Sequence, residues 1–120
     1  MGKRYSHYLK ASKMRGPYAL TQRNAAALPD GAGVYLLAEE GASGATVVCY
    51  VGRAEVLSRR VGQHVGKYSM FFFKKQRTDV GAFISECREF HRYGKVHHLD
   101  NRIHPARPKG SSFPLCSEQG

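Results

Sequence analysis

The middle of the chain carries polar side chains whose types and spacing suit chemistry on a phosphate group. Arg60 and His64 lie four residues apart in a segment of helical periodicity, residues 55–66, so they border the same apolar stripe. An arginine binds phosphate oxygens through a planar fork of donors and keeps its charge. A histidine beside it can orient water or relay a proton. Arg59 points elsewhere on this helix, so we expect it to be an ordinary exposed side chain.

The chain has few carboxylates, and Glu86 is the best placed of its nine acids to face a cleft. At 100° per residue it lies beside the apolar stripe of a second helical segment, next to Phe83 and Phe90. Glu89 falls nearly opposite that stripe, so we expect it to be solvated. The alternative for Glu86 is an ion pair with an adjacent arginine on the helix surface.

The elements that position these residues follow from local patterns. Residues 33–38 and 46–51 are short, largely apolar segments joined through a glycine-rich turn, which favours a β-hairpin. Residues 68–73 form an aromatic segment typical of a third strand. The second helix follows Thr78 or Asp79 as a cap and ends near Gly94. The order predicts a small α/β or α+β layer, with helices covering a short mixed or antiparallel sheet.

Composition bounds the kind of protein. The 120 residues suit one domain, and 19 Lys plus Arg against 9 Asp plus Glu give a net charge of +10, which favours a nucleic-acid partner over an anionic membrane. No apolar segment is long enough to cross a membrane, and the first residues lack the apolar core of a secretory signal. The three cysteines are widely spaced, which favours reduced thiols and a cytoplasmic protein.

Charge and composition divide the chain into three parts. Residues 1–28 carry six Lys or Arg and no acid, interleaved with three tyrosines, so we expect a basic arm facing nucleic acid, with a short helix around residues 21–27. Residues 29–105 hold the predicted domain. Residues 106–120 are rich in proline and are expected to form a poorly ordered tail.

The motifs in this domain resemble the GIY-YIG nuclease family. Gly33-Val34-Tyr35 is followed by Tyr50-Val51-Gly52, and residues 50–64 fit the family pattern Y-[IV]-G-x-[SA]-x-x-L-x-x-R-x-x-x-[HY] at every defined position. Residues 82–86 resemble the family's helix with its metal-binding glutamate, and Asn101 resembles the asparagine that closes the domain. Arg53 stands where many members have lysine. The resemblance covers roughly residues 29–105.

The resemblance implies a small three-stranded, largely antiparallel sheet flanked by helices, and a DNA endonuclease using one divalent cation, Mg²⁺ or Mn²⁺. It implies five catalytic side chains, with Glu86 holding the metal and Arg60 the phosphate: Tyr35, Tyr50, Arg60, His64 and Glu86. Gly52, Arg53 and Asn101 are expected to contact substrate. One of the two tyrosines helps deprotonate water, and the sequence leaves open which one. A free phenol is a poor base near pH 7 unless a nearby cation lowers its pKa, and Arg53 or the metal could supply that charge.

Two other functions fit parts of the sequence. A zinc protein could use Cys87 and His91, four residues apart on one helix, with downstream histidines at His97, His98 and His104. A binding module without activity could stack nucleic-acid bases on Tyr68 and the three phenylalanines of residues 71–73. Single-strand or duplex specificity and the oligomeric state stay open.

Overall fold

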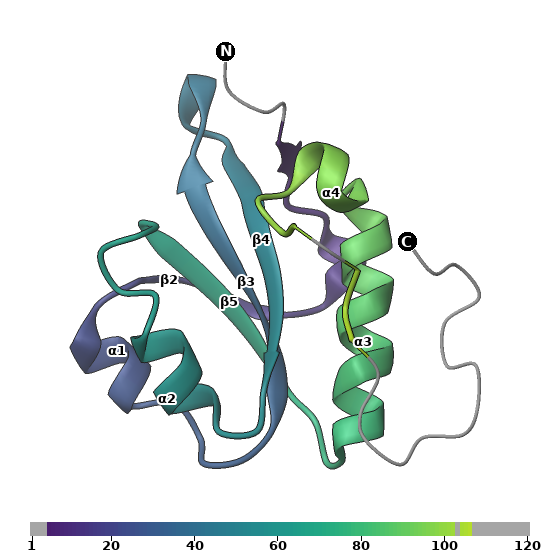
Figure 1. The fold of residues 1–120 in the computed structure, drawn as a ribbon. Coiled ribbons are helices and arrows are strands. Elements are labelled where there is room, and N and C mark those ends of the chain that lie inside the picture. The colour runs from purple at the N-terminus through teal and green to yellow at the C-terminus, as the bar shows by residue number, and fades with distance from the viewer. Residues whose placement is uncertain (1–4, 103, 107–120) are drawn as a thin grey trace.

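A computed structural model describes residues 5–102 and 104–106 of the chain. Figure 1 shows one layer of strands with helices on both of its faces. The strands are β1 (Ser6–His7), β2 (Arg15–Ala19), β3 (Gly33–Glu40), β4 (Thr46–Ala54) and β5 (Met70–Lys75). The helices are α1 (Gln22–Ala26), α2 (Leu57–Gly62), α3 (Asp79–Arg92) and α4 (Lys95–His98), with short 3-10 turns η1 (Lys10–Ser12) and η2 (Ala42–Gly44). The predicted tail beyond Ala106 lies outside the described residues.

The sheet has five strands in the order β1-β4-β3-β5-β2, and every pair is antiparallel. The mixed α and β class is therefore confirmed, but the expected number of three strands is wrong. The segment predicted as an arm supplies both additional strands. It pairs with β4 through β1, crosses the sheet, and pairs with β5 through β2. Sequence reasoning missed these strands because β1 has only two residues and β2 contains glycine and proline, which local rules assign to loops.

The β3–β4 hairpin forms the centre of the fold, as the glycine-rich turn predicts. Tyr35 lies opposite Gly52, and Leu37 lies opposite Tyr50. The register then shifts, so that Ala38 pairs with Val48 and Cys49 is the extra residue of a β-bulge. β1 covers only Val47 and Val48 on the outer edge of β4. The rest of that edge, toward Ala54, is available to the side chains described below.

Alternating residues of the central strands build two cores, one on each face of the sheet. Tyr35 and Leu37 pack with Leu57 and Val61 of α2 on one face. Leu36 and Ala38 pack with Phe90 and Tyr93 on the other face, which α3 covers. The phenylalanines of residues 71–73 divide between these cores and are all buried, so they offer no exposed platform for stacking bases.

Helix α3 begins as predicted, with the Thr78 hydroxyl accepting the N–H of Gly81, and its chain direction changes at Gly94. The prediction that Glu89 is solvated is wrong, because its exposed fraction is only 4%. The N-terminal segment crosses that side of α3, and the Ser12 hydroxyl donates to Glu89 Oε1 at 2.5 Å. The sequence of α3 predicts one buried and one exposed face. In the structure, the N-terminal segment also covers part of the face that was expected to be exposed.

No helix among the described residues has the length and apolarity needed to cross a membrane.

Candidate active site

Two tyrosines from neighbouring strands form the floor of the candidate site. Tyr35 on β3 is buried, Tyr50 on β4 is half-buried, and their ring centroids are 6.3 Å apart. Both rings lie on the α2 face, because Tyr50 packs against the core that contains Tyr35. Each hairpin strand therefore delivers one phenol to the same place.

Gly52 makes room for one of these rings. A Cβ atom at this position would lie 2.4 Å from both Cζ and the hydroxyl oxygen of Tyr35, its cross-strand partner. Any larger residue would displace the ring. Gly52 was predicted to contact substrate; what the geometry explains is the close approach of Tyr35, and substrate contact stays a prediction.

His64 completes a cluster of three rings. It follows α2, and its Nε2 atom lies 3.0 Å from the Tyr35 hydroxyl. The imidazole centroid is 5.6 Å from the Tyr35 ring and 5.4 Å from the Tyr50 ring. Burial lowers the pKa of His64, and the positive charges of Lys67 and Arg60 lower it further. The imidazole is therefore neutral near pH 7, so Nε2 can accept the phenolic proton in a hydrogen bond.

Both phenols keep their protons at neutral pH. Burial raises the pKa of Tyr35 well above its usual range, and the neighbouring Tyr50 adds to the effect. Burial also raises the pKa of Tyr50, and the charge of Glu86 adds to it. Arg60 opposes both shifts. Neither phenol becomes a phenolate base from the protein's own charges, so a further cation would have to act on it.

Arg60 is exposed, and its positive charge lowers the pKa of Tyr35, of Tyr50 and of Glu86. Arg59, the next residue of α2, is also exposed and perturbs none of these groups. The guanidinium of Arg60 thus borders the ring cluster and remains accessible to a ligand. The two arginines differ as helical spacing predicts.

Glu86 approaches the cluster from α3, on the other side of the sheet. Its Oε1 atom accepts a hydrogen bond from Arg53 Nη1 at 2.8 Å, and the Arg53 guanidinium lies 5.3 Å from the Phe83 ring centroid. The exposed fraction of Glu86 is 8%. Burial raises its pKa to about 7, and the charges of Arg53 and Arg60 partly oppose that rise. The ion pair crosses between two elements, so it differs from the surface pair weighed as the alternative for Glu86.

Asn101 lies beside Tyr50 and holds the backbone of β4. Its Oδ1 accepts the N–H of Val51 at 3.0 Å, and its Nδ2 donates to the Val51 carbonyl at 2.7 Å. The N–H of Asp100 donates to the Cys49 carbonyl at 2.7 Å. Residues 100 and 101 therefore brace β4 on both sides of Tyr50. Because both amide atoms of Asn101 are engaged, the geometry explains a positioning role, and its predicted substrate contact stays a prediction.

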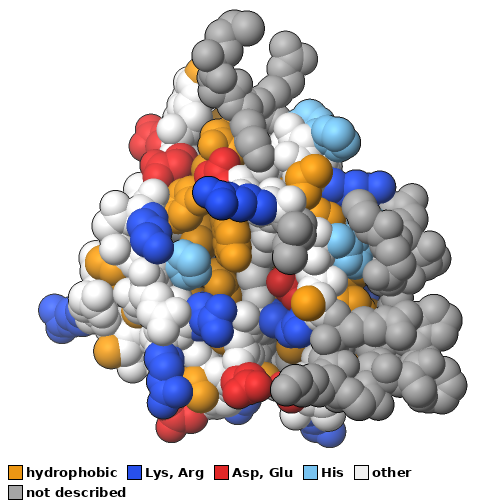
Figure 2. All heavy atoms as spheres, in the orientation of Figure 1, with side chains coloured by type: hydrophobic (Ala, Val, Ile, Leu, Met, Phe, Trp, Pro, Cys, Tyr) orange, Lys and Arg blue, Asp and Glu red, His pale blue; other side chains and the backbone are white. Residues whose placement is uncertain are grey.

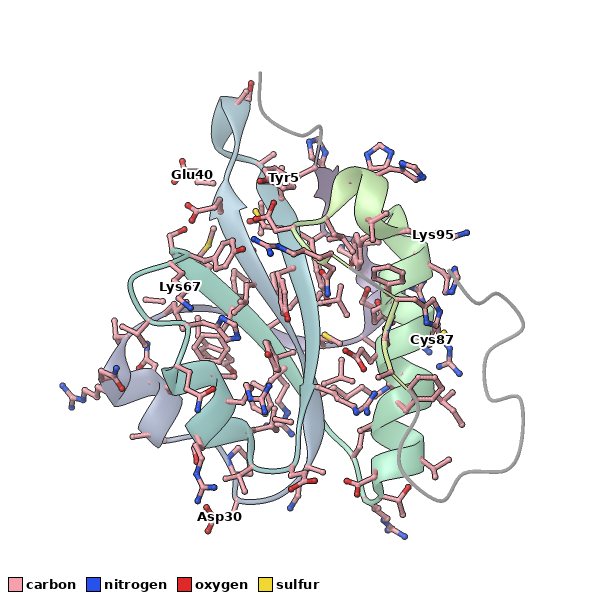
Figure 3. All side chains as sticks on the ribbon, in the orientation of Figure 1. Tyr5, Asp30, Glu40, Lys67, Cys87 and Lys95 are labelled. Carbon is pink, nitrogen blue, oxygen red and sulfur yellow. The ribbon has the colours of Figure 1, made fainter. Side chains whose placement is uncertain are left out.

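Sequence reasoning missed two tyrosines, Tyr5 and Tyr68, that both bind to Asp100. Tyr5 donates to Asp100 Oδ1 at 2.9 Å, and Tyr68 donates to Asp100 Oδ2 at 2.8 Å. Burial and the hydrogen bond to Asp100 raise the pKa of Tyr5 to about 12. Tyr5 lies near β4, at the α4 end of the sheet (Figure 3). No local pattern reveals this group, since 95 residues separate Tyr5 from Asp100.

Three of the residues considered for zinc form a second cluster, Cys87 and His91 of α3 together with His104, and His97 and His98 of α4 are not part of it. The ligand atoms of Cys87, His91 and His104 lie within 4.8 Å of one another, and the two Nε2 atoms are 3.1 Å apart. Cys87 is disulfide-bonded in the structure, however, so its sulfur does not offer the thiolate that zinc prefers. Cys49 is a buried free thiol, as expected. The expectation of reduced thiols is thus wrong at Cys87, because spacing along the chain does not determine which sulfurs meet in space.

Figure 2 shows the face that carries the ring cluster. Apolar side chains gather in its middle, a histidine lies beside them, and Lys or Arg side chains lie around them, with Asp or Glu side chains among them. The positive side chains next to the apolar group suit an anionic ligand.

Comparisons with protein families, with curated proteins and with solved structures yield no match to this chain. The likeness to the GIY-YIG nucleases therefore rests on the residues themselves and on the positions they occupy.

Proposed function

We propose that this protein is a divalent-metal-dependent endonuclease that hydrolyses phosphodiester bonds in DNA. The observation that carries the proposal is one constellation: two phenols and a neutral imidazole in contact, bordered by an exposed guanidinium and a buried carboxylate. Hydrolysis of a phosphodiester needs an oriented water, donors for the phosphoryl oxygens and help for the leaving oxygen. The constellation offers groups for each task.

The water-orienting group is the pair formed by Tyr35 and His64. The phenol hydrogen-bonds to His64 Nε2 across 3.0 Å. As the water oxygen attacks phosphorus, the water gives its proton to the Tyr35 oxygen while the phenolic proton passes to His64 Nε2, so that Tyr35 stays neutral. The bond from phosphorus to the leaving oxygen breaks, and that oxygen takes a proton from a second water. Tyr50 lies across the cluster from this pair, where its hydroxyl can contact the same phosphate.

The phosphate-binding groups are the two arginines. Arg60 is exposed at the rim and can bind two phosphoryl oxygens at once. Arg53 is engaged by Glu86, and can turn to the substrate when that carboxylate takes another partner. The positive charge then sits where the transition state gains negative charge.

The carboxylate of Glu86 fits a hard divalent cation. Its Oε1 atom accepts Arg53, while Oε2 makes no hydrogen bond to the part of the chain that the structure describes. Mg²⁺ keeps most of its waters and needs one or two carboxylates, so a single glutamate is an adequate protein ligand. When bound, Mg²⁺ or Mn²⁺ would acidify water and neutralise charge on the phosphoryl oxygens.

A cleavage assay that compares substitutions of two neighbouring arginines tests the proposal. Wild type, Arg60→Ala and Arg59→Ala are compared on labelled single-stranded and duplex DNA, with Mg²⁺, with Mn²⁺ and with chelator. We expect Arg60→Ala to lower kcat/KM about 10²-fold to 10³-fold, because it removes a donor to the transition state. Arg59→Ala is the matched control, since it removes the same charge from the same helix. Equal losses in both variants, or cleavage that persists in chelator, would contradict the mechanism.

The same assay addresses the binding-module alternative. Wild-type protein that retains DNA without cutting it under any divalent metal would replace the nuclease proposal with that alternative. Zinc that stays bound in stoichiometric amount through dialysis would favour a structural metal at His91 and His104 instead.

A further inference from the structure

A hollow lies against the crossing N-terminal segment. It has a volume of about 580 Å³, within the range of small-ligand sites, and is bordered by the segment itself, by β2 and by the start of β4. Its lining residues are His7, Tyr8, Lys10, Lys13, Met14, Gly16, Pro17, Ala45, Thr46 and Phe72. None of the ring-cluster residues takes part, so the hollow is separate from the candidate active site.

The charge of this hollow has one sign. Its charged lining residues are Lys10 and Lys13, both exposed, with the exposed imidazole of His7 beside them, and no carboxylate of the described residues lines it. A ligand with a negative charge is therefore attracted from both lysines without a competing acid.

The half-buried ring of Tyr8 supplies the aromatic surface of this hollow, and the buried ring of Phe72 supports it from behind. Tyr8 stacks on Phe72 with ring centroids 4.0 Å apart and ring planes inclined by 3°. Gly16 lets the backbone of the crossing segment press against this pair, because a Cβ there would lie 2.9 Å from the Phe72 ring. Aromatic rings beside cations are the combination that binds the base and the phosphate of a nucleotide unit.

The walls of the hollow are held in place by hydrogen bonds. The Tyr8 hydroxyl accepts the N–H of Met14 at 3.0 Å, and the Tyr93 hydroxyl accepts the N–H of Leu9 at 3.0 Å. Buried Ser12 bonds to both Tyr93 and Glu89 of α3. A site fixed in this way loses little conformational freedom on binding, which favours affinity.

We propose that this hollow is a second nucleic-acid site, which holds a nucleotide unit of the substrate strand away from the point of cleavage; the proposal rests on the nuclease function proposed above. Thr46 lines the hollow and Arg53 borders the ring cluster, so the two sites are separated by about 23 Å along β4, at about 3.3 Å per residue. They lie on opposite faces of the sheet, because Tyr8 packs against the core that contains Phe72 and Tyr50 against the core that contains Tyr35. A strand that occupies both sites must pass round an edge of the sheet, so it needs more than about seven nucleotides, the number that covers about 23 Å at about 3.4 Å each. Stacking rings and paired cations favour a nucleotide over an acidic peptide, which offers charge without a base.

Binding is measured with the full chain as Glu86→Gln in chelator, so that no cutting intervenes. The test variant is Lys10→Gln with Lys13→Asn, where asparagine suits the left-handed backbone of residue 13, whose φ is 53°. The control variant, Arg23→Gln with Arg88→Gln, removes the same charge from exposed residues of α1 and α3. Fluorescent DNA strands of 5 and 20 nucleotides are titrated at several salt concentrations.

We expect the test variant to bind the 20-nucleotide strand roughly tenfold more weakly than the control variant, with a salt slope smaller by about two. The shorter strand is not expected to distinguish the two variants, because it cannot span both sites. Photo-crosslinking of a bromouracil-containing 20-nucleotide strand should attach to the peptide that contains Tyr8.

Three results would overturn the proposal. The test and control variants could bind the 20-nucleotide strand equally, the crosslinks could fall only on the ring-cluster face, or a poly-glutamate peptide could displace the strand from the hollow at equal concentration. Cleavage by wild type with metal is measured in a separate assay, so that failure of the nuclease proposal can be told apart from failure of the second site. A wild type that cuts while the test variant behaves like the control refutes the second site alone. A wild type that never cuts but crosslinks at Tyr8 supports the second site and refutes the nuclease.

Discussion

Helix α3 buries two carboxylates that are three residues apart, Glu86 and Glu89, and the two are held in different ways. On the side toward the ring cluster, Glu86 accepts one bond from Arg53, a residue of another element whose side chain is 25% exposed. On the side toward the crossing segment, Glu89 accepts Ser12 at 2.5 Å and Arg92 at 3.0 Å. Burial alone does not separate them, since their exposed fractions are 8% and 4%.

The difference lies in what the partners can do. Arg92 is three residues from Glu89 on the same helix, and Ser12 is buried, so that group is complete within the protein. Arg53 reaches Glu86 from the rim of the site and has an anionic ligand as an alternative partner. A buried carboxylate whose partner can exchange is suited to function, whereas one with fixed partners stabilises the fold.

The largest expected effect comes from substituting each of these acids by its amide. We expect Glu86→Gln to lower cleavage about 10³-fold, because it removes the carboxylate to which the proposed mechanism assigns the cation. Glu89→Gln should keep cleavage within about threefold and instead cost about 1–2 kcal/mol of unfolding free energy, through its bond to Arg92. Cleavage rates and urea unfolding of both variants check this pair. Loss of cleavage in folded Glu89→Gln would contradict the assignment of Glu86 to function and of Glu89 to stability.

The pH dependence of stability sharpens the same comparison. The pKa of Glu86 is raised from 4.5 to about 7, so its contribution to stability is fully present below pH 4.5 and is lost as the pH rises through 7. Relative to Glu86→Gln, wild type should therefore lose at most about 3 kcal/mol of unfolding free energy between pH 4.5 and pH 8. Urea unfolding at several pH values without divalent metal measures the difference. A constant difference between the two proteins would show that Glu86 titrates normally.

Arg53 should set the pH at which the site becomes active. Its charge lowers the pKa of Glu86, so Arg53→Met should raise that pKa and move the acid limb of the kcat/KM profile to higher pH, by about one unit. Arg53→Lys keeps the charge and should leave the limb near its wild-type position. Arg92→Met is the matched substitution at the partner of Glu89 and should lower stability without moving the profile. If the acid limb of the kcat/KM profile stays at the same pH in Arg53→Met, Arg53 does not control the protonation of Glu86.

The smallest effect concerns the brace beside Tyr50. Asp100→Asn keeps the shape of the side chain but can accept only one of the two phenols, Tyr5 and Tyr68. We expect kcat to fall about threefold to tenfold with KM nearly unchanged, because Tyr50 loses orientation rather than substrate contact. Asp30→Asn, at an exposed acid, is the control. A rise in KM alone would mean that the phenols bind substrate directly.

Much of the candidate site could be predicted because its residues occupy regular elements. The spacing of Arg60 and His64 in a helix, and the placing of Glu86 beside an apolar stripe, depend only on a period of 3.6 residues. Tyr35 and Tyr50 come together because a glycine-rich turn folds two apolar segments into a hairpin. The fold was less accessible, since the edge strands β1 and β2 exist through pairing with distant strands rather than through their own sequence.

The sequence by itself determined the types of the candidate site residues, the elements that carry most of them and the excess of positive charge. Only the tertiary structure decided which charges meet. Local periodicity cannot reveal that Arg53 crosses to Glu86, that Asp100 gathers two tyrosines, or that the basic N-terminal segment lies across the sheet and buries Glu89. Those contacts join residues far apart in the chain, and their strength depends on burial, which arises only when the layers close.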